Sequence, residues 1–267
     1  MEKWLILILG VLVIGMVIYY NAVKKRNHCK VIQSGKEENV IHEKETQIAP
    51  GYTLMIAPFD FARHQKIAAQ QFFDNYAFFE LTPKKADEYF LWFQKEIPGR
   101  IALLWEYMKK ERPETQPFDY SPESLIPLWD WYETKIKQVP KSKKEIDYEV
   151  SRYPKWMEEN VRKITMKFTD ETLSLALDIA IYLGETIIKN YPNLYWGYFL
   201  KPKSEFSARK PVILKLKSKR MYFPPAGTVF VCMIKSSKNR DKNRLYDLYR
   251  YSEDEFDPVK PSYWDSW

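Results

Sequence analysis

Residues 169–196, TDETLSLALDIAIYLGETIIKNYPNLYW, constrain the fold more than any other stretch of the chain. At about 100° per residue, apolar side chains cover most of the circumference of a helix here, which is typical of a helix enclosed by protein. The residues that form this apolar surface are Leu173, Leu177, Ala180, Ile181, Leu183, Gly184, Ile187 and Ile188. Thr169 is the expected N-cap. Pro192 is expected to end the helix, because proline cannot donate a backbone hydrogen bond and disfavours helical geometry at Tyr191.

One narrow polar seam runs along this helix. Glu171, Asp178 and Glu185 recur every seven residues, so they drift by only about 20° around the axis at each step. Lys189 follows Glu185 at a spacing that favours an ion pair. The seam is therefore either the one wet or salt-bridged edge of the helix, or a pair of desolvated carboxylates.

Aromatic-rich helices are expected before this central helix. Apolar side chains recur with a helical period in residues 59–79, 82–97, 101–108 and 122–136. Thr82 and Ser121 each precede a proline, as N-caps do. Ser142 and Glu145 have capping-box spacing. Pro98 and the glycine after it are expected to bend or break a helix.

After residue 196 the pattern changes to strands. Residues 194–200, 212–216 and 228–234 are strand-like runs, and the last two are separated by the turn signal PPAG. Residues 241–251 are expected to form a final helix. Helices followed by a small antiparallel sheet predict an α+β domain over residues 51–256. Residues 24–50 are expected to form a polar tether, and residues 257–267 a C-terminal tail.

Residues 4–20 carry no charge, and extension to residue 23 gives about 20 residues, or roughly 30 Å of helix, enough to cross a bilayer. A cleaved signal peptide is the alternative, but Tyr20 stands where a small residue would be needed and basic residues follow at once. The sequence therefore predicts a transmembrane anchor at residues 1–23. Because cations crowd its C-terminal flank, we expect a single-pass protein of the cell membrane with its N-terminus outside and its domain in the cytoplasm.

The sequence offers no motif for a metal or a cofactor. Glycine-rich phosphate loops, nucleophile elbows and paired cysteines are missing, and His28 and His42 have no other ligand at a useful spacing. Cys29 and Cys232 are expected to be free thiols. A lysine-rich run after residue 134 follows several aromatic residues, but those aromatics have core spacing, so nucleic acid is not a favoured partner. We expect no cofactor and no metal.

Two sets of residues are candidates for function. Asp178 and Glu185 should face Trp196, together with Lys201 or Lys203 from the adjoining strand; if both carboxylates were desolvated, one would take up a proton and could act as an acid or base. The chain also has a net charge of +7, and Arg209 belongs to a basic region around the late strands. This region is either a solvated sheet face or a surface for an acidic protein partner.

The order LTPKKADEYFLWFQKEIPGRI, LIPLWDWY, LALDIAIYLGETIIKNYPNLYWGYFLKPK and RKPVI resembles a family of bacterial proteins of Gram-positive type that are similar to immunity proteins of polymorphic-toxin systems. The resemblance spans about residues 79–212. Its most specific piece combines six residues: Asp178, Leu183, Gly184, Glu185, Leu194 and Trp196. The resemblance implies a protein-binding role and provides no catalytic residues, and the membrane anchor is a departure from the family's pattern.

Two hypotheses follow. The first is a membrane-anchored, cytoplasm-facing and non-catalytic module that binds a protein partner, with an immunity-like role as its sharpest form. The second is a membrane-tethered hydrolase that uses Asp178 and Glu185. Their seven-residue spacing corresponds to about 10.5 Å along a helix, which disfavours joint action on one bond. The sequence gives no indication of which oligomeric state the protein adopts.

Overall fold

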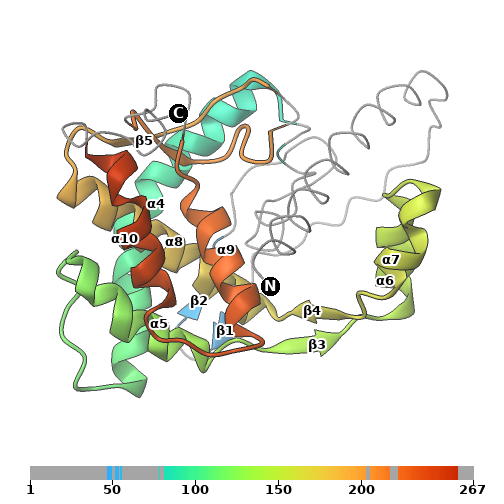
Figure 1. Ribbon diagram of the computed structural model, residues 1–267, viewed down its shortest axis with the longest axis horizontal. Coiled ribbons are helices and arrows are strands. Elements are labelled where there is room, and N and C mark those ends of the chain that lie inside the picture. Colours follow the sequence, from blue (N-terminus) through green and yellow to red (C-terminus); the bar gives the residue numbers. More distant parts are fainter. Residues whose placement is uncertain are drawn as a thin grey trace. The chain divides into compact units, whose positions relative to one another are not determined.

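The computed structural model describes residues 47–49, 52–53, 55, 78, 81–202, 205–216 and 222–257 (Figure 1). The predicted anchor at residues 4–23, most of the tether, most of the helix predicted at 59–79, nearly all of the tail, and Lys203 lie outside the described residues. Within the described ranges, no helix is both long enough and apolar enough to span a bilayer. Strand β1 (Gln47–Ala49) pairs with β2 (Tyr52–Thr53), so regular structure begins inside the range predicted as tether.

The contacts of the chain separate two compact units. The described residues of the small unit are Val139–Lys167; those of the main unit fall within Glu45–Gln138 and Phe168–Trp267. The sequence predicts one domain over residues 51–256, whereas the contacts group the residues of the small unit apart from the rest of that range. The two units are described separately below.

The main unit is built around α8 (Asp170–Asn190), as the sequence predicts. From Thr172 to Ile187, every residue of α8 except Glu185 is buried. The Thr169 hydroxyl accepts a hydrogen bond from the Thr172 amide at 3.3 Å, which confirms the predicted N-cap. The helix ends directly before Pro192, again as expected.

Helix α4 (Pro83–Glu111) lies against α8 and does not break at Pro98. Of the predicted bend or break, the break is therefore wrong. Interior proline costs about 3 kcal/mol because one hydrogen bond is lost and the ring clashes with the preceding turn. Burial of large apolar side chains on both sides of Pro98 offsets this, at about 1.5–3 kcal/mol for each fully buried side chain. The side chains concerned include Tyr89, Phe93, Ile101 and Leu104.

Helix α9 (Pro225–Ser236) also packs on α8, where the sequence predicted a strand at residues 228–234. That prediction is wrong. The run TVFVCMI has strand-like composition, but Val229, Cys232 and Met233 are the buried members and share the helical spacing of three and four residues. Pro225 stands at the first helical position, where its missing N–H costs nothing. Packing on α8 thus overrides the local strand preference.

The remaining elements complete an α+β fold. The 3-10 helix η1 (Pro122–Ser124) leads into α5 (Leu125–Glu133), and α10 (Arg244–Phe256) confirms the expected last helix. Strands β5 (Tyr195–Gly197) and β6 (Val212–Leu214) pair antiparallel, with Trp196 opposite Ile213. In the described part of the chain each sheet has two strands, so the predicted late antiparallel sheet is present but smaller than expected.

The small unit begins in β3 (Gln138–Pro140) and ends in β4 (Met166–Phe168), which form a two-stranded sheet. Between them lie α6 (Lys143–Ser151), the 3-10 helix η2 (Lys155–Met157) and α7 (Glu158–Arg162). The predicted capping box is confirmed at the start of α6: Ser142 accepts from the Glu145 amide, and the Glu145 carboxylate accepts from the Ser142 amide.

Gly99 gives a test of the continuous α4. A Cβ added at Gly99 meets no atom within 4 Å, and the residue is helical and exposed. Gly99→Ala should therefore stabilise the protein by about 0.5–1 kcal/mol, because alanine loses less backbone entropy in a helix. The measurement is urea denaturation of the full chain in detergent. A lower midpoint for Gly99→Ala would indicate that α4 is interrupted there.

Candidate functional site

Asp178, the central carboxylate of the predicted site, is fully buried in α8 and holds an ion pair with Arg100 from α4. Arg100 Nε donates to Asp178 Oδ1 at 2.8 Å, and Arg100 Nη2 donates to Asp178 Oδ2 at 2.6 Å. This two-point geometry matches the planar guanidinium to the planar carboxylate. The sequence left open a wet or a salt-bridged edge for this seam; at Asp178 the seam is salt-bridged and closed to water.

Strand β2 supplies the third member of this buried cluster. The Tyr52 hydroxyl donates to Asp178 Oδ2, and Arg100 Nη1 donates to the Thr53 carbonyl oxygen at 2.9 Å. The rings of Tyr52 and Tyr107 are stacked with centroids 4.9 Å apart. The cluster thus joins β2, α4 and α8 through the buried side chains of Tyr52, Arg100 and Asp178 and the part-buried carbonyl of Thr53.

The charge states in the cluster follow from burial and proximity. Burial raises the pKa of the Asp178 carboxyl, and the attraction and hydrogen bonds of Arg100 oppose that shift. Burial lowers the pKa of Arg100, but the attraction and hydrogen bonds of Asp178 and Tyr52 together raise it above its ordinary value, so the guanidinium stays protonated. Burial and the neighbouring Asp178 both raise the pKa of Tyr52, which therefore remains a donor. Every hydrogen-bonding group that faces Asp178 is thus a donor.

Glu185 and Trp196 meet as the sequence predicts. The indole Nε1 of Trp196 donates to Glu185 Oε1 at 2.8 Å. The ring of Trp196 lies so close to Gly184 that a Cβ there would overlap it, and it packs edge-on against Phe93 with centroids 5.2 Å apart. Lys189 does not define this site, since its ammonium lies over the ring of Tyr120 at 5.4 Å. Glu185 serves to orient the indole.

Asp178 and Glu185 do not act together. Each belongs to a separate hydrogen-bonded group, one around Arg100 and one around Trp196. Seven residues of helix separate them by about 10.5 Å along the axis, further than a shared proton or a single scissile bond requires. The two carboxylates are therefore not brought together as an acid and base pair.

The two described basic candidates, Lys201 and Arg209, differ in their exposure to solvent. Lys201 is exposed, just before Pro202, as a surface contact requires. Arg209 is buried, and its Nη1 lies 3.4 Å from the carbonyl oxygen of Phe78, to which it donates. Arg209 thus cannot meet a partner in this conformation. A positive φ of 65° at Arg209 helps to turn the chain so that this side chain points inward.

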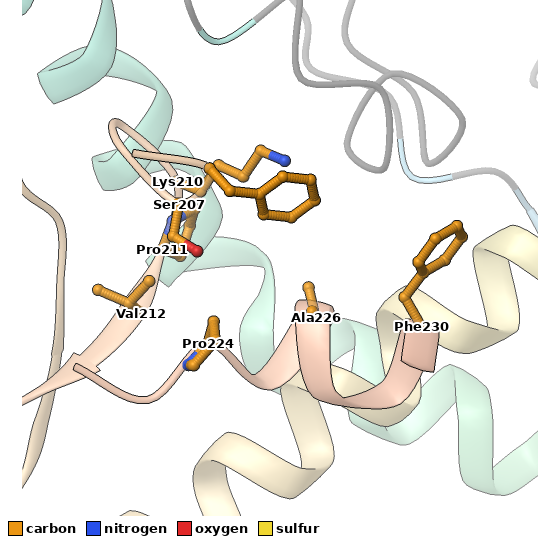
Figure 2. Close-up of a pocket in the computed structure, with 9 residues that line it drawn as sticks. Ser207, Lys210, Pro211, Val212, Pro224, Ala226 and Phe230 are labelled. Carbon is orange, nitrogen blue, oxygen red and sulfur yellow. The ribbon is translucent and has the colours of Figure 1, made fainter. Parts of the chain in front are cut away.

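A shallow pocket lies between the start of α9 and the segment before β6 (Figure 2). Its lining residues are Phe206, Ser207, Lys210, Pro211, Val212, Pro224, Ala226, Gly227 and Phe230. The Lys210 ammonium lies 4.3 Å from the centroid of the Phe206 ring, a cation–π arrangement. None of the five predicted site residues that the structure describes, Asp178, Glu185, Trp196, Lys201 and Arg209, lines this pocket.

The described residues contain neither a metal-binding cluster nor a reactive cysteine thiol. These residues contain no cluster of three or more His, Cys, Asp or Glu side chains that could hold a metal ion. Cys232 is buried on α9, and burial raises the pKa of its thiol to about 12, so the nucleophilic thiolate is scarce at neutral pH.

The two residues that complete the buried cluster, Tyr52 and Arg100, were not predicted from sequence. A signal was present, because a carboxylate on a helix that is apolar all round needs a cation. Arg100 was overlooked because it directly follows the expected break at Pro98.

Replacement of one member of the buried ion pair should lower the free energy of unfolding far more than replacement of both members. Arg100→Met leaves Asp178 buried without its cation and should cost about 3–5 kcal/mol. The double variant Arg100→Met, Asp178→Asn should be more stable than Arg100→Met alone, because no buried charge is left and the amide oxygen still accepts from Tyr52. Urea denaturation of the full chain in detergent measures both.

The matched control is the half-exposed pair Lys85–Glu88 on the same helix α4, where the corresponding single and double changes should have little effect. If Arg100→Met and the double variant are destabilised equally, the ion pair is not the reason that Arg100 matters. Arg100→Lys serves where Arg100→Met does not fold, since it keeps the charge and loses only the two-point geometry.

Comparisons with known proteins find no relative: no protein-family model matches the chain, and neither the curated proteins nor the solved structures contain a match.

Proposed function

We propose that the protein is a non-catalytic interaction module, anchored to the membrane by residues 4–23, that binds an acidic protein partner on the cytoplasmic side. An immunity-like role, in which the partner is a toxin, is the sharpest form of this proposal. It is the function suggested by the resemblance in the sequence, and the structure offers one observation against its rival, the hydrolase hypothesis.

That observation concerns Asp178, whose two carboxylate oxygens are both held by hydrogen bonds inside the protein. Both of its oxygens accept hydrogen bonds from Arg100, one also accepts from Tyr52, and the side chain has no exposed surface. A general base must reach a substrate proton directly or through one water, and Asp178 can do neither. Glu185, which is bound by Trp196, lies in another group of contacts. The hydrolase hypothesis thus loses its pair of carboxylates.

The charge of the chain supports an acidic partner. The net charge of +7 is an excess of 42 basic over 35 acidic residues. Such an excess raises the association rate with an acidic partner and makes the affinity fall with ionic strength. Of the basic residues proposed for binding, Lys201 is exposed and Arg209 is buried, so the proposal now centres on Lys201.

The partner can be sought directly. The full chain, purified from native membranes in mild detergent at low salt, should carry a stoichiometric protein of acidic pI. That protein should dissociate at about 1 M salt, where the Debye length is about 3 Å. Lys201→Glu should weaken its retention, whereas Lys238→Glu, an exposed lysine on the loop after α9, should not. Purification of the chain with no such protein would contradict the proposal.

The anchor has its own test. With residues 4–23 in the bilayer, the full chain should stay in the membrane fraction after extraction with alkaline carbonate, and protease added to intact cells should leave the domain uncut. Release by carbonate would exclude the anchor. Digestion of the domain in intact cells would reverse the topology and leave the anchor in place.

A further inference from the structure

Exposed apolar side chains gather in the small unit. Five of the nine large hydrophobic side chains that are exposed in the described residues belong to it: Val139, Tyr148, Trp156, Ile164 and Met166. Of the described residues 139–167, only Val161 is buried. Trp156 is 61% exposed and Ile164 57%. Isolated exposed apolar residues are ordinary, but this many in one short segment indicate a surface that meets something apolar.

Within residues 139–167, each acidic side chain forms an ion pair with a basic side chain of the same range. Arg162 pairs with Asp147 at 2.8 Å and with Glu158 at 3.0 Å, which ties α6 to α7. The other three pairs are Lys141–Glu149, Lys163–Glu159 and Lys167–Glu145. These five acids are all the acidic residues in residues 139–167. Eight basic residues against these five acids, 8 − 5, give residues 139–167 a net charge of +3.

Three exposed lysines carry that charge: Lys143, Lys144 and Lys155, none of which has an ion-pair partner within the described part of the chain. Lys143 and Lys144 stand in the first turn of α6, where the helix dipole disfavours positive charge. Lys155 directly precedes the exposed Trp156. Neither the positions of the lysines nor the exposure of the indole benefits the folded unit by itself, so both are better explained by an anionic and apolar surface outside it.

We propose that the small unit docks on the surface of an anionic lipid bilayer, with Trp156 and its apolar neighbours in the interfacial layer and the three lysines among the headgroups. Tryptophan and tyrosine favour the interface, and each nearby cation contributes about 1 kcal/mol on an anionic leaflet. The inference rests on the proposed function in one respect: the anchor at residues 4–23 would hold the unit close to a bilayer.

A bilayer fits these residues better than a folded partner does. Protein interfaces depend on a few anchors that fill well-packed pockets. The exposed apolar side chains here come from β3, α6, η2, β4 and the segment after α7, and the pocket in Figure 2 is lined by residues of the main unit alone. A lipid surface needs apolar side chains that can insert and cations around them, with no preformed pocket.

The test places a polarity-sensitive fluorophore on the small unit of the full chain. Cys29→Ser leaves the buried Cys232, whose poor reactivity is checked by labelling that variant alone. Trp156→Cys or Ile164→Cys then receives the label, and Tyr251→Cys, 88% exposed on α10 of the main unit, is the matched control. Each protein is placed in nanodiscs of phosphatidylcholine, with or without phosphatidylglycerol, and brominated lipids act as quenchers.

Labels at positions 156 and 164 should shift to the blue and be quenched by brominated lipid in discs that contain phosphatidylglycerol, and the label at 251 should not.

The triple variant Lys143→Glu, Lys144→Glu, Lys155→Glu should lower the docking equilibrium by roughly 100-fold or more, at about 1 kcal/mol per cation. The control triple Lys238→Glu, Arg240→Glu, Lys242→Glu exchanges the same charge on exposed residues of the main unit and should leave docking unchanged.

Absence of quenching at both 156 and 164 would overturn the proposal, as would equal quenching in discs without phosphatidylglycerol. Protection of position 156 by a second copy or by another protein, detected by cross-linking without lipid quenching, would show that the surface is a protein interface. A second experiment separates docking from anchoring: the labelled chain is depleted of detergent, and vesicles of the same lipid compositions are added. If carbonate releases the chain from membranes but the labels at 156 and 164 still shift to the blue and are quenched, the docking surface is kept and the anchor is excluded.

Discussion

The ion pair between Asp178 and Arg100 fixes the arrangement of the main unit. A carboxylate inside a helix that is buried on all sides has no access to water, and its ionisation is tolerable only with a cation at hydrogen-bonding distance. Arg100 meets this need from the middle of α4. From β2, the Tyr52 hydroxyl donates to Asp178, and the Thr53 carbonyl oxygen accepts from Arg100. Because apolar contacts tolerate small shifts and a two-point ion pair does not, this cluster sets the register of β2, α4 and α8 against one another.

The Asp178–Arg100 pair also shows which kind of contact the sequence does not predict. The enclosed helix, its two ends and the contact of Trp196 with Glu185 follow from local signals: a helical period, a cap, a proline, and a strand that folds back at once. Arg100 is 78 residues from Asp178 in the sequence, and no local period links them. The expected break at Pro98 also came from a local rule, and burial on both sides of the proline overrides it. The errors therefore lie where long-range packing decides the outcome.

Composition was least informative for the late segments. The run in α9 has the residues of a strand and the spacing of a helix, and its contact with α8 decides between them. Arg209 was expected at a solvated sheet face or at a surface for an acidic partner because its neighbours are basic, yet its side chain is buried. Trp156 and Ile164 are large apolar residues, yet both are exposed. In each case the identity of the residue was known and the direction of its side chain was not.

The two units are stabilised in opposite ways, and this bears on what each can do. The main unit has a large aromatic and aliphatic core, so its surface can change with little effect on folding. The described residues of the small unit, 139–167, include one buried residue and several ion pairs between half-exposed or exposed side chains. Such pairs contribute only about 0–1 kcal/mol each and are screened by salt. Any surface that covers Trp156 would therefore add a large fraction of the small unit's stability, so docking and local folding should be coupled in this segment.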